Sequence, residues 1–382
     1  MNSYDRILKT FKREAVDKVP VFHIGFSSYA ASLILNREAY IGGGIQQWRE
    51  ASSLWNGEEA HEEFLDRSYS DAFEISNVLD MDMVRTDYWR FPVKPWKKID
   101  DYNFVFGNED CWTHRRFDPL NELFEIVDSR PKKKETTFED LEKELEEEEA
   151  ELNEFHPTPK DFPGARRALE FFGEEKPIRG GAGEIWIPLE NIWMEAIYLR
   201  PDLVRKTLRI HLERAKKEIK CLSDMGARFI FGGGDLASTT GPVYSPAIFR
   251  EFVQPCIREI TEFCHNMGLY YLYNSDGNLW PLANDLFGES GVDGYYEVDR
   301  LAGMDLEKLR TQFPKLTLIG NISSITLHVG SRSQVIEETL SCLETAKKYN
   351  GVIVGCSNYL VPGTPMENII AMVDTLQKNR AT

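Results

Sequence analysis

The sequence contains few cysteines, and no two of them form a closely spaced pair. The six cysteines are scattered without a CxxC motif, at Cys111, Cys221, Cys256, Cys264, Cys342 and Cys356. This spacing argues against both a disulfide framework and a zinc ribbon. We expect most of these side chains to be buried and to pack as small apolar groups.

Long hydrophobic runs are also lacking. No apolar segment approaches the roughly 20 residues that a helix needs to cross a bilayer. The first 20 residues lack the hydrophobic core of a signal peptide and instead predict a short amphipathic helix. We therefore expect a cytoplasmic protein.

Positive charge is scarce as well. The chain has 45 lysines and arginines against 62 aspartates and glutamates, which gives a formal net charge of −17. A nucleic-acid backbone and an anionic membrane are both bound by basic surfaces. The charge balance therefore argues against nucleic acid and against a membrane surface as partners.

What the sequence does contain is an alternation of short apolar runs and longer helical patterns. The predicted strands are 19–24, 81–86, 178–185, 228–232, 269–274, 292–298, 316–320 and 351–355. The predicted helices between them include 202–225, 245–267, 304–312, 332–348 and 365–378. This order predicts an α/β fold of the (β/α)₈ type, a TIM barrel, as a single domain over residues 1–382 with a helical N-terminal segment.

One region, residues 87–160, does not fit the alternation. We interpret it as an insertion over or beside the barrel mouth, meaning the carboxyl ends of the barrel strands. Residues 87–127 are rich in aromatic and turn residues and predict an inserted hairpin. Residues 131–154 are strongly acidic with a thin leucine stripe, which predicts a solvated helix; a docking surface for a partner protein is the alternative.

Polar residues stand at the ends of most predicted strands, where barrel enzymes carry their catalytic groups. Glu184 and Asp235 follow glycines at strand ends and are candidates for general acid–base catalysis. Asp276 lies just beyond another strand end. The candidates for substrate binding at strand ends are His23, Asn274, Glu297, Asn321 and Cys356.

Tyrosines are unusually dense on two neighbouring predicted strands. Of these we expect Tyr273, Tyr295 and Tyr296 to contribute to an aromatic substrate pocket suited to a flat, apolar molecule. Because side chains alternate along a strand, about half of the tyrosines should instead point outward into the helical layer. The glycines at 180–183 and 232–234 predict close backbone approach to a ligand, or turn geometry alone.

Four blocks of the sequence resemble the uroporphyrinogen decarboxylase superfamily. They are RILKTFKREAVDKVPVF at 6–22, GGGDLASTTGPVYSPAIFREFVQP at 232–255, NSDGNLWPL at 274–282 and GCSNYLVPGTPMENI at 355–369. The resemblance covers nearly the whole chain except 87–160. It implies a (β/α)₈ barrel, in agreement with the strand count.

The resemblance implies one of two activities. The decarboxylases carry an arginine-containing segment after the first strand, but this chain reads GFSSYAAS there, at 25–32, without an arginine. The other branch comprises methyltransferases that exchange methyl groups with a cobalamin (corrinoid) carried by a separate small protein. We expect this branch, with that corrinoid protein as partner.

Two metal sites can be compared with those of the methyltransferase branch. The zinc ligands of its thiol methylases fall here on Asn274, Asp276 and Cys356, of which only the cysteine is retained, so zinc is doubtful. A spacing E-x14-E-x20-H, which the resemblance links to demethylating components, occurs as a weak candidate metal trio. Its members are Glu175, Glu190 and His211.

The resemblance therefore implies an O-demethylase component that moves a methyl group from a methoxylated aromatic to Co(I). Asp276 would protonate the leaving oxygen, with Glu184, Asp235 or a mouth tyrosine as alternatives, while His23 and the two asparagines orient the ring. A decarboxylase of another acid, a thiol methyltransferase and a non-catalytic binding protein remain open. A decarboxylase would need an arginine cluster in the mouth, and Arg85, Arg179 and Arg228 do not form one in sequence. The resemblance also implies a homodimer.

Overall fold

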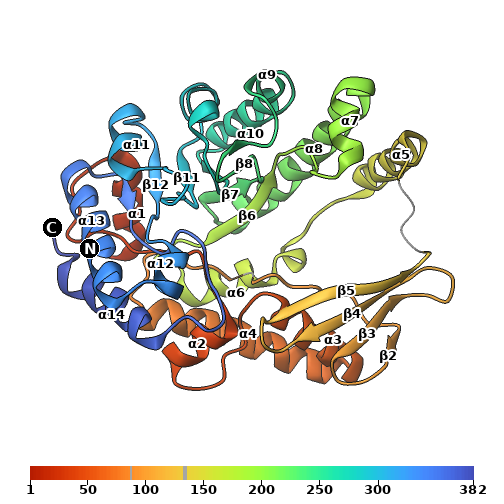
Figure 1. Cartoon of the computed structure of the whole chain (residues 1–382), viewed down its shortest axis with the longest axis horizontal. Coiled ribbons are helices and arrows are strands. Elements are labelled where there is room, and N and C mark those ends of the chain that lie inside the picture. The colour runs from red at the N-terminus through yellow and green to blue at the C-terminus, as the bar shows by residue number, and fades with distance from the viewer. Residues whose placement is uncertain (87, 132–135) are drawn as a thin grey trace.

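The computed structural model describes residues 1–86, 88–131 and 136–382 and has a mixed α/β fold built around a parallel sheet (Figure 1). The six strands of this sheet are hydrogen-bonded in the order β13-β12-β11-β10-β7-β6. Their bounds are β6 Arg179–Glu184, β7 Phe229–Gly233, β10 Tyr270–Asn274, β11 Gly294–Tyr296, β12 Thr317–Ile319 and β13 Val352–Ile353. Each coincides with a predicted strand. Near-continuous apolar residues suit strands buried on both faces, and β6, which is rich in glycine, is the exception.

The remaining two predicted strands are present only as isolated bridges. Val21 pairs in parallel with Val354 of the segment after β13, and Val84 pairs in parallel with Ile178, just before β6. The Asp82 N–H donates to the Val21 carbonyl at 2.7 Å, so hydrogen bonds connect both edges of the sheet through these two segments. The Val21 N–H is taken by the Asp82 carboxylate at 2.8 Å, and this side-chain bond interrupts the regular ladder.

Helices flank the sheet and follow most of the predicted ranges. Their bounds are α1 Ser3–Lys12, α2 Ser28–Leu35, α3 Gly44–Asn56, α4 Glu58–Val78, α6 Pro163–Phe172, α7 Asn191–Leu199, α8 Pro201–Met225, α11 Leu306–Gln312, α12 Ser324–Val329, α13 Arg332–Tyr349 and α14 Met366–Asn379. The range predicted as one helix, 245–267, is divided into α9 Pro246–Ile248, a π-helical turn η2 Phe249–Val253 and α10 Gln254–Asn266. No helix of the described residues is long and apolar enough to cross a membrane.

Several short elements complete the chain. They are β1 Gly25–Phe26, which pairs with β14 Tyr359–Leu360, the antiparallel pair β8 Ala237–Ser238 and β9 Gly241–Pro242, the 3₁₀ turns η1 Pro159–Asp161 and η3 Trp280–Leu282, and the π-helical turn η4 Asn284–Glu289. The β1–β14 pair lies at the carboxyl ends of the first and last segments of the sheet. It therefore extends the sheet toward the candidate site.

Where the sequence predicts an inserted hairpin, the structure has a four-stranded antiparallel sheet beside α3 and α4 (Figure 1). Its strands are β2 Lys97–Lys98, β3 Asn103–Gly107, β4 Trp112–Asp118 and β5 Leu123–Arg130. A separate small core of Phe104, Phe106, Phe117 and Phe124 packs on Ala51 of α3. Residue 87 and residues 132–135 of the predicted insertion lie outside the described residues.

The acidic stretch forms helix α5, Phe138–Glu154, which lies on α8. Leu141, Leu145 and Leu152 are buried, and Glu149 forms a 3.0 Å ion pair with Lys206 of α8. The other acidic side chains of α5 are exposed. The helix is therefore attached along its leucine stripe and solvated elsewhere.

A buried ion network joins the two ends of the chain beneath the sheet. The Asp82 carboxylate is fully buried and is contacted by Arg6 of α1, at 2.5 Å, and by Arg380, just after α14. Nearby, Lys18 pairs with Ala381 in an antiparallel bridge, and the two termini lie close together in Figure 1. The network fixes the first and last helices to the second segment of the sheet.

Candidate active site

The carboxyl ends of β7, β10 and β11 bring a group of carboxylates together around Asp276. Burial, together with the charges of Glu297, Asp299 and Asp235, raises the pKa of Asp276 to about 7. The Asn358 amide donates to Asp276 Oδ2 at 2.7 Å and opposes this shift. Asp276 is therefore a carboxylic acid that can hold a proton near neutral pH.

Below Asp276, a hydrogen-bonded layer links β6, β10 and β11. The Tyr296 hydroxyl contacts Asn274 Oδ1 at 3.0 Å and the Gly232 carbonyl at 2.7 Å, and Asn274 Nδ2 donates to Glu297 at 2.5 Å. Arg179 donates to the Tyr296 hydroxyl at 3.4 Å. Both polar groups of the Asn274 side chain are thus engaged by the protein.

Glu297 is held in an unusual conformation in this layer. Its φ is +66°, a left-handed value that costs a non-glycine residue free energy and is found most often at functional sites. Burial raises the pKa of Glu297, while the Asn274 hydrogen bond and the charges of Arg179 and Arg85 lower it. The residue therefore supports the layer and adds to the negative field at Asp276.

Arg85 and Arg179, both named in the sequence analysis as arginines near strands, act on Glu297 in this layer. Arg85 and Arg179 lie on neighbouring segments, and the charge of Arg179, after burial, helps to lower the pKa of Arg85 to about 10. Arg179 begins its strand, and its long side chain reaches the Tyr296 hydroxyl. Trp89, whose ring centroid lies 4.3 Å from the Arg85 guanidinium, was not identified from the sequence.

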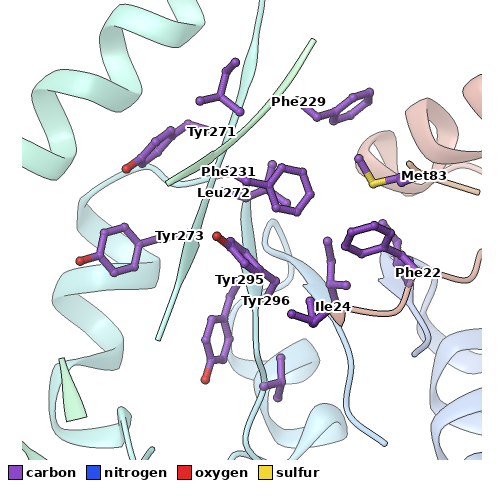
Figure 2. Close-up of a cluster of buried hydrophobic side chains, with 14 of the residues drawn as sticks. Phe22, Ile24, Met83, Phe229, Phe231, Tyr271, Leu272, Tyr273, Tyr295 and Tyr296 are labelled. Atoms are coloured by element: carbon purple, nitrogen blue, oxygen red, sulfur yellow. The ribbon is translucent and has the colours of Figure 1, made fainter. Parts of the chain in front are cut away.

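The predicted tyrosines take different positions. Tyr273 and Tyr295 are buried in the layer between sheet and helices, where their hydroxyls donate to the carbonyls of Ile185 at 2.5 Å and Ser275 at 3.2 Å. Tyr296 lies with Phe231 on the other side of the sheet, with ring centroids 4.9 Å apart (Figure 2). Strand alternation explains the division.

Three further predicted residues are buried and contact the protein. His23 Nδ1 accepts a hydrogen bond from the Cys356 N–H at 3.0 Å, and burial together with Arg380 lowers the pKa of His23 to about 4. Burial raises the pKa of the Cys356 thiol to about 12. The Asn321 amide donates to the Met304 carbonyl at 3.0 Å. These side chains position the strand ends around the mouth.

The other predicted catalytic carboxylates, Glu184 at the end of β6 and Asp235 after β7, are exposed. The members of the weak candidate metal trio stand in different parts of the chain: Glu175 precedes β6, Glu190 precedes α7, and His211 lies within α8. Within the described part of the chain, no group of three or more His, Cys, Asp or Glu side chains could hold a metal. The Asp276 carboxylate accepts its hydrogen bond from Asn358, while the Cys356 thiol is buried.

The glycines at 232–234 serve packing within the sheet. A Cβ atom on Gly233 would lie 1.4 Å from Asn274 Oδ1, so Gly233→Ala should displace Asn274 and destabilise the fold by about 1–3 kcal/mol. Gly181→Ala is the matched control on β6, because a Cβ there meets nothing within 4 Å. Urea denaturation should give equal stability for Gly181→Ala and the native chain, and equal losses for both variants would contradict the assignment.

Comparisons with known proteins agree with this architecture. The family model described as uroporphyrinogen decarboxylase (URO-D) matches residues 190–379. A curated uroporphyrinogen decarboxylase from Anaeromyxobacter sp. (strain Fw109-5) is 26% identical over 133 residues, which span 34% of this chain and only 36% of that protein. The solved structure of a methyltransferase from Methanosarcina mazei covers 99% of both chains with a TM-score of 0.65 and 19% identity. Residues 190–379, just under half of the chain, are therefore similar to the uroporphyrinogen decarboxylase family, and the fold of the whole chain is similar to that of the methyltransferase.

Proposed function

We propose that the protein transfers a methyl group from a methoxylated aromatic compound to the corrinoid of a partner protein. The observation that carries this proposal is Asp276, a carboxylic acid with a pKa raised to about 7 at the carboxyl end of β10. Breaking an aryl methyl ether releases a phenolate, and a proton supplied to that oxygen makes it a better leaving group. The full-length similarity to a methyltransferase fold supports the same reading.

We also infer that the sheet closes into a (β/α)₈ barrel. The support comes from the pairing of Val21 with Val354, the Asp82–Val21 hydrogen bond and the pairing of Val84 with Ile178, which link the two edge strands. In such barrels the active site lies at the carboxyl ends of the strands. This is the end at which Asp276, Glu297 and Asn358 meet.

The roles of the residues follow from their positions. The partner's corrinoid, as Co(I), supplies the nucleophile for the methyl carbon. As the carbon–oxygen bond breaks, its electron pair stays on the ether oxygen, and Asp276 donates its proton to that oxygen to give a phenol. Asn358 holds Oδ2 of Asp276 as an acceptor and so leaves the proton on Oδ1. Glu297 and Asn274 are joined by a hydrogen bond and hold the layer beneath Asp276 in place.

The charges at the mouth favour this function over decarboxylation of a polycarboxylate. Arg85 and Arg179 both act on Glu297, while Asp235, Asp276 and Asp299 cluster at the same strand ends. With Asp276 protonated, the charges of Asp235 and Asp299 would still repel a substrate with several carboxyl groups. An uncharged ether would meet no such repulsion.

Incubation with methoxyarenes and free cob(I)alamin tests the proposal. We expect methylcobalamin to form, which its absorption spectrum measures. The value of kcat/KM should be independent of pH below about 7 and should fall tenfold per pH unit above it. The sign follows because Asp276 is active only while protonated, and its pKa is raised to about 7. Failure to methylate cob(I)alamin from any methoxyarene would contradict the proposal, and transfer from a methylamine alone would show a different methyl donor.

A further inference from the structure

Trp89 is a large aromatic side chain that lies partly exposed at the mouth. It stands three residues after the segment 81–86, on the side of the sheet where the strands end. It is 42% exposed, and its φ is +39°, a left-handed value that costs a bulky residue free energy. Residues held in such conformations gather at active sites and ligand contacts, and their surroundings have to hold them there. Trp89 is therefore a candidate for contact with a ligand.

Three neighbours fix the Trp89 ring in place. The Arg85 guanidinium lies 4.3 Å from the ring centroid, at cation–π distance. The Tyr359 ring meets the indole at 89°, with ring centroids 5.1 Å apart. A Cβ atom on Gly25 would lie 3.4 Å from the indole, so the backbone of β1 also packs close to it. The indole is therefore a preformed surface, held from the second segment of the sheet, β1 and β14.

The same neighbours connect Trp89 to the candidate acid. Tyr359 follows Asn358 in the chain, and its N–H donates to the side-chain oxygen of Asn358 at 2.6 Å. The amide nitrogen of Asn358 in turn donates to Asp276 Oδ2 at 2.7 Å. Two residues, Tyr359 and Asn358, thus connect the indole to the carboxyl group that holds the proton. A ring bound against Trp89 would lie beside that group.

The chemistry of an exposed indole indicates what it binds. Two aromatic rings attract each other, offset-stacked or edge to face, beyond what burial of their area contributes, and a saturated ring of the same size lacks this attraction. The charges of Asp235 and Asp299 at the same strand ends disfavour an anionic ligand. We propose that Trp89 binds the aromatic ring of the substrate and so selects aryl ethers over saturated ethers. This inference rests on the proposed function, which names the methoxylated ring but not the residue that recognises it.

The test compares two uncharged ligands of similar size by calorimetric titration: ortho-dimethoxybenzene and its fully hydrogenated analogue. The native chain should bind the arene more tightly. Trp89→Leu should lower the ratio of the two affinities roughly three- to tenfold, the contribution of one aromatic pair, because the effect of area burial cancels in the ratio. Trp89→Phe keeps a ring and should retain most of the ratio. Trp96→Leu is the matched control, since Trp96 is 47% exposed but precedes β2 in the antiparallel sheet.

Turnover gives a second measurement, and the outcomes separate this inference from the proposed function. With cob(I)alamin as acceptor, Trp89→Leu should raise KM for methoxyarenes and leave kcat nearly unchanged, because the ring contact is present in the bound substrate and in the transition state alike. An unchanged affinity ratio in Trp89→Leu, the same fall in Trp96→Leu, or a native chain that binds the arene no better than the saturated ring would overturn the role of Trp89, even if methyl transfer occurs. A fall confined to Trp89→Leu supports that role even if no methoxyarene is demethylated, which is the result that contradicts the proposed function.

Discussion

Asp276→Asn should slow methyl transfer to cob(I)alamin by roughly 100- to 10,000-fold while leaving the fold intact, the range expected for loss of a general acid. Asparagine has nearly the same shape as aspartic acid but no acidic proton to give to the leaving oxygen. The Asn358 amide, now at 2.7 Å from Asp276, can still find an oxygen acceptor in the new side chain. Single-turnover formation of methylcobalamin measures the loss.

The defect should depend on the leaving group. Ethers of more acidic phenols need less protonation, so the ratio of native to variant rates should shrink steadily as the pKa of the released phenol falls. Glu184→Gln and Asp235→Asn are matched controls at neighbouring strand ends, where both side chains are exposed. We expect these variants to lose less than about tenfold, below the usual range for a general acid. A constant defect across the ethers would show that Asp276 does not act as the acid.

Asp82→Ala should destabilise the protein by about 3–5 kcal/mol, the usual cost of removing one partner from a buried ion pair. The carboxylate has no solvent exposure and compensates both Arg6 and Arg380, whose side chains are only 4% and 5% exposed. Without the Asp82 carboxylate, the buried guanidinium groups of Arg6 and Arg380 each lose an ion-pair partner, and the Val21 N–H loses its acceptor. Urea denaturation followed by circular dichroism measures the change.

Asp17→Ala provides the comparison. Asp17 also pairs with Arg6, at 2.8 Å, but its side chain is 43% exposed, so water replaces much of the interaction when the carboxylate is removed. A loss of at most about 1 kcal/mol is expected there. If Asp82→Ala and Asp17→Ala were equally stable, the burial of Asp82 would not be the source of its contribution to stability.

The parallel sheet was readable from the sequence because its strands are short, apolar and separated by amphipathic helices. The segments at 19–24 and 81–86 satisfy the same pattern, yet a carboxylate from one replaces a ladder bond of the other, which apolar periodicity does not reveal. Helices α2 to α4 were not identified. The helical spacing of Phe64, Ser68 and Ala72, all buried in α4, was a visible signal for one of them.

The site was predictable in part, at the level of which residues follow strands. Asn274, Asp276 and Glu297 were found in this way, and the structure brings them together. The face of the sheet on which a tyrosine lies depends on its position in the alternation along the strand, and a shift of the strand by one residue moves it to the other face. The reach of Arg179 from the far end of β6 depends on a side-chain conformation that spacing does not encode.

The buried contact between Arg380 and Asp82 also bears on the order of folding. These residues are separated by 298 positions, so the carboxylate is not fully compensated until the last helix has docked. Contacts between distant parts of a chain form slowly, because a long loop must close before they stabilise anything. During synthesis, the first segments of the sheet therefore remain without part of their support until Arg380 has been made. We expect a nascent chain of this protein to depend on late closure, and to be most open to aggregation just before it.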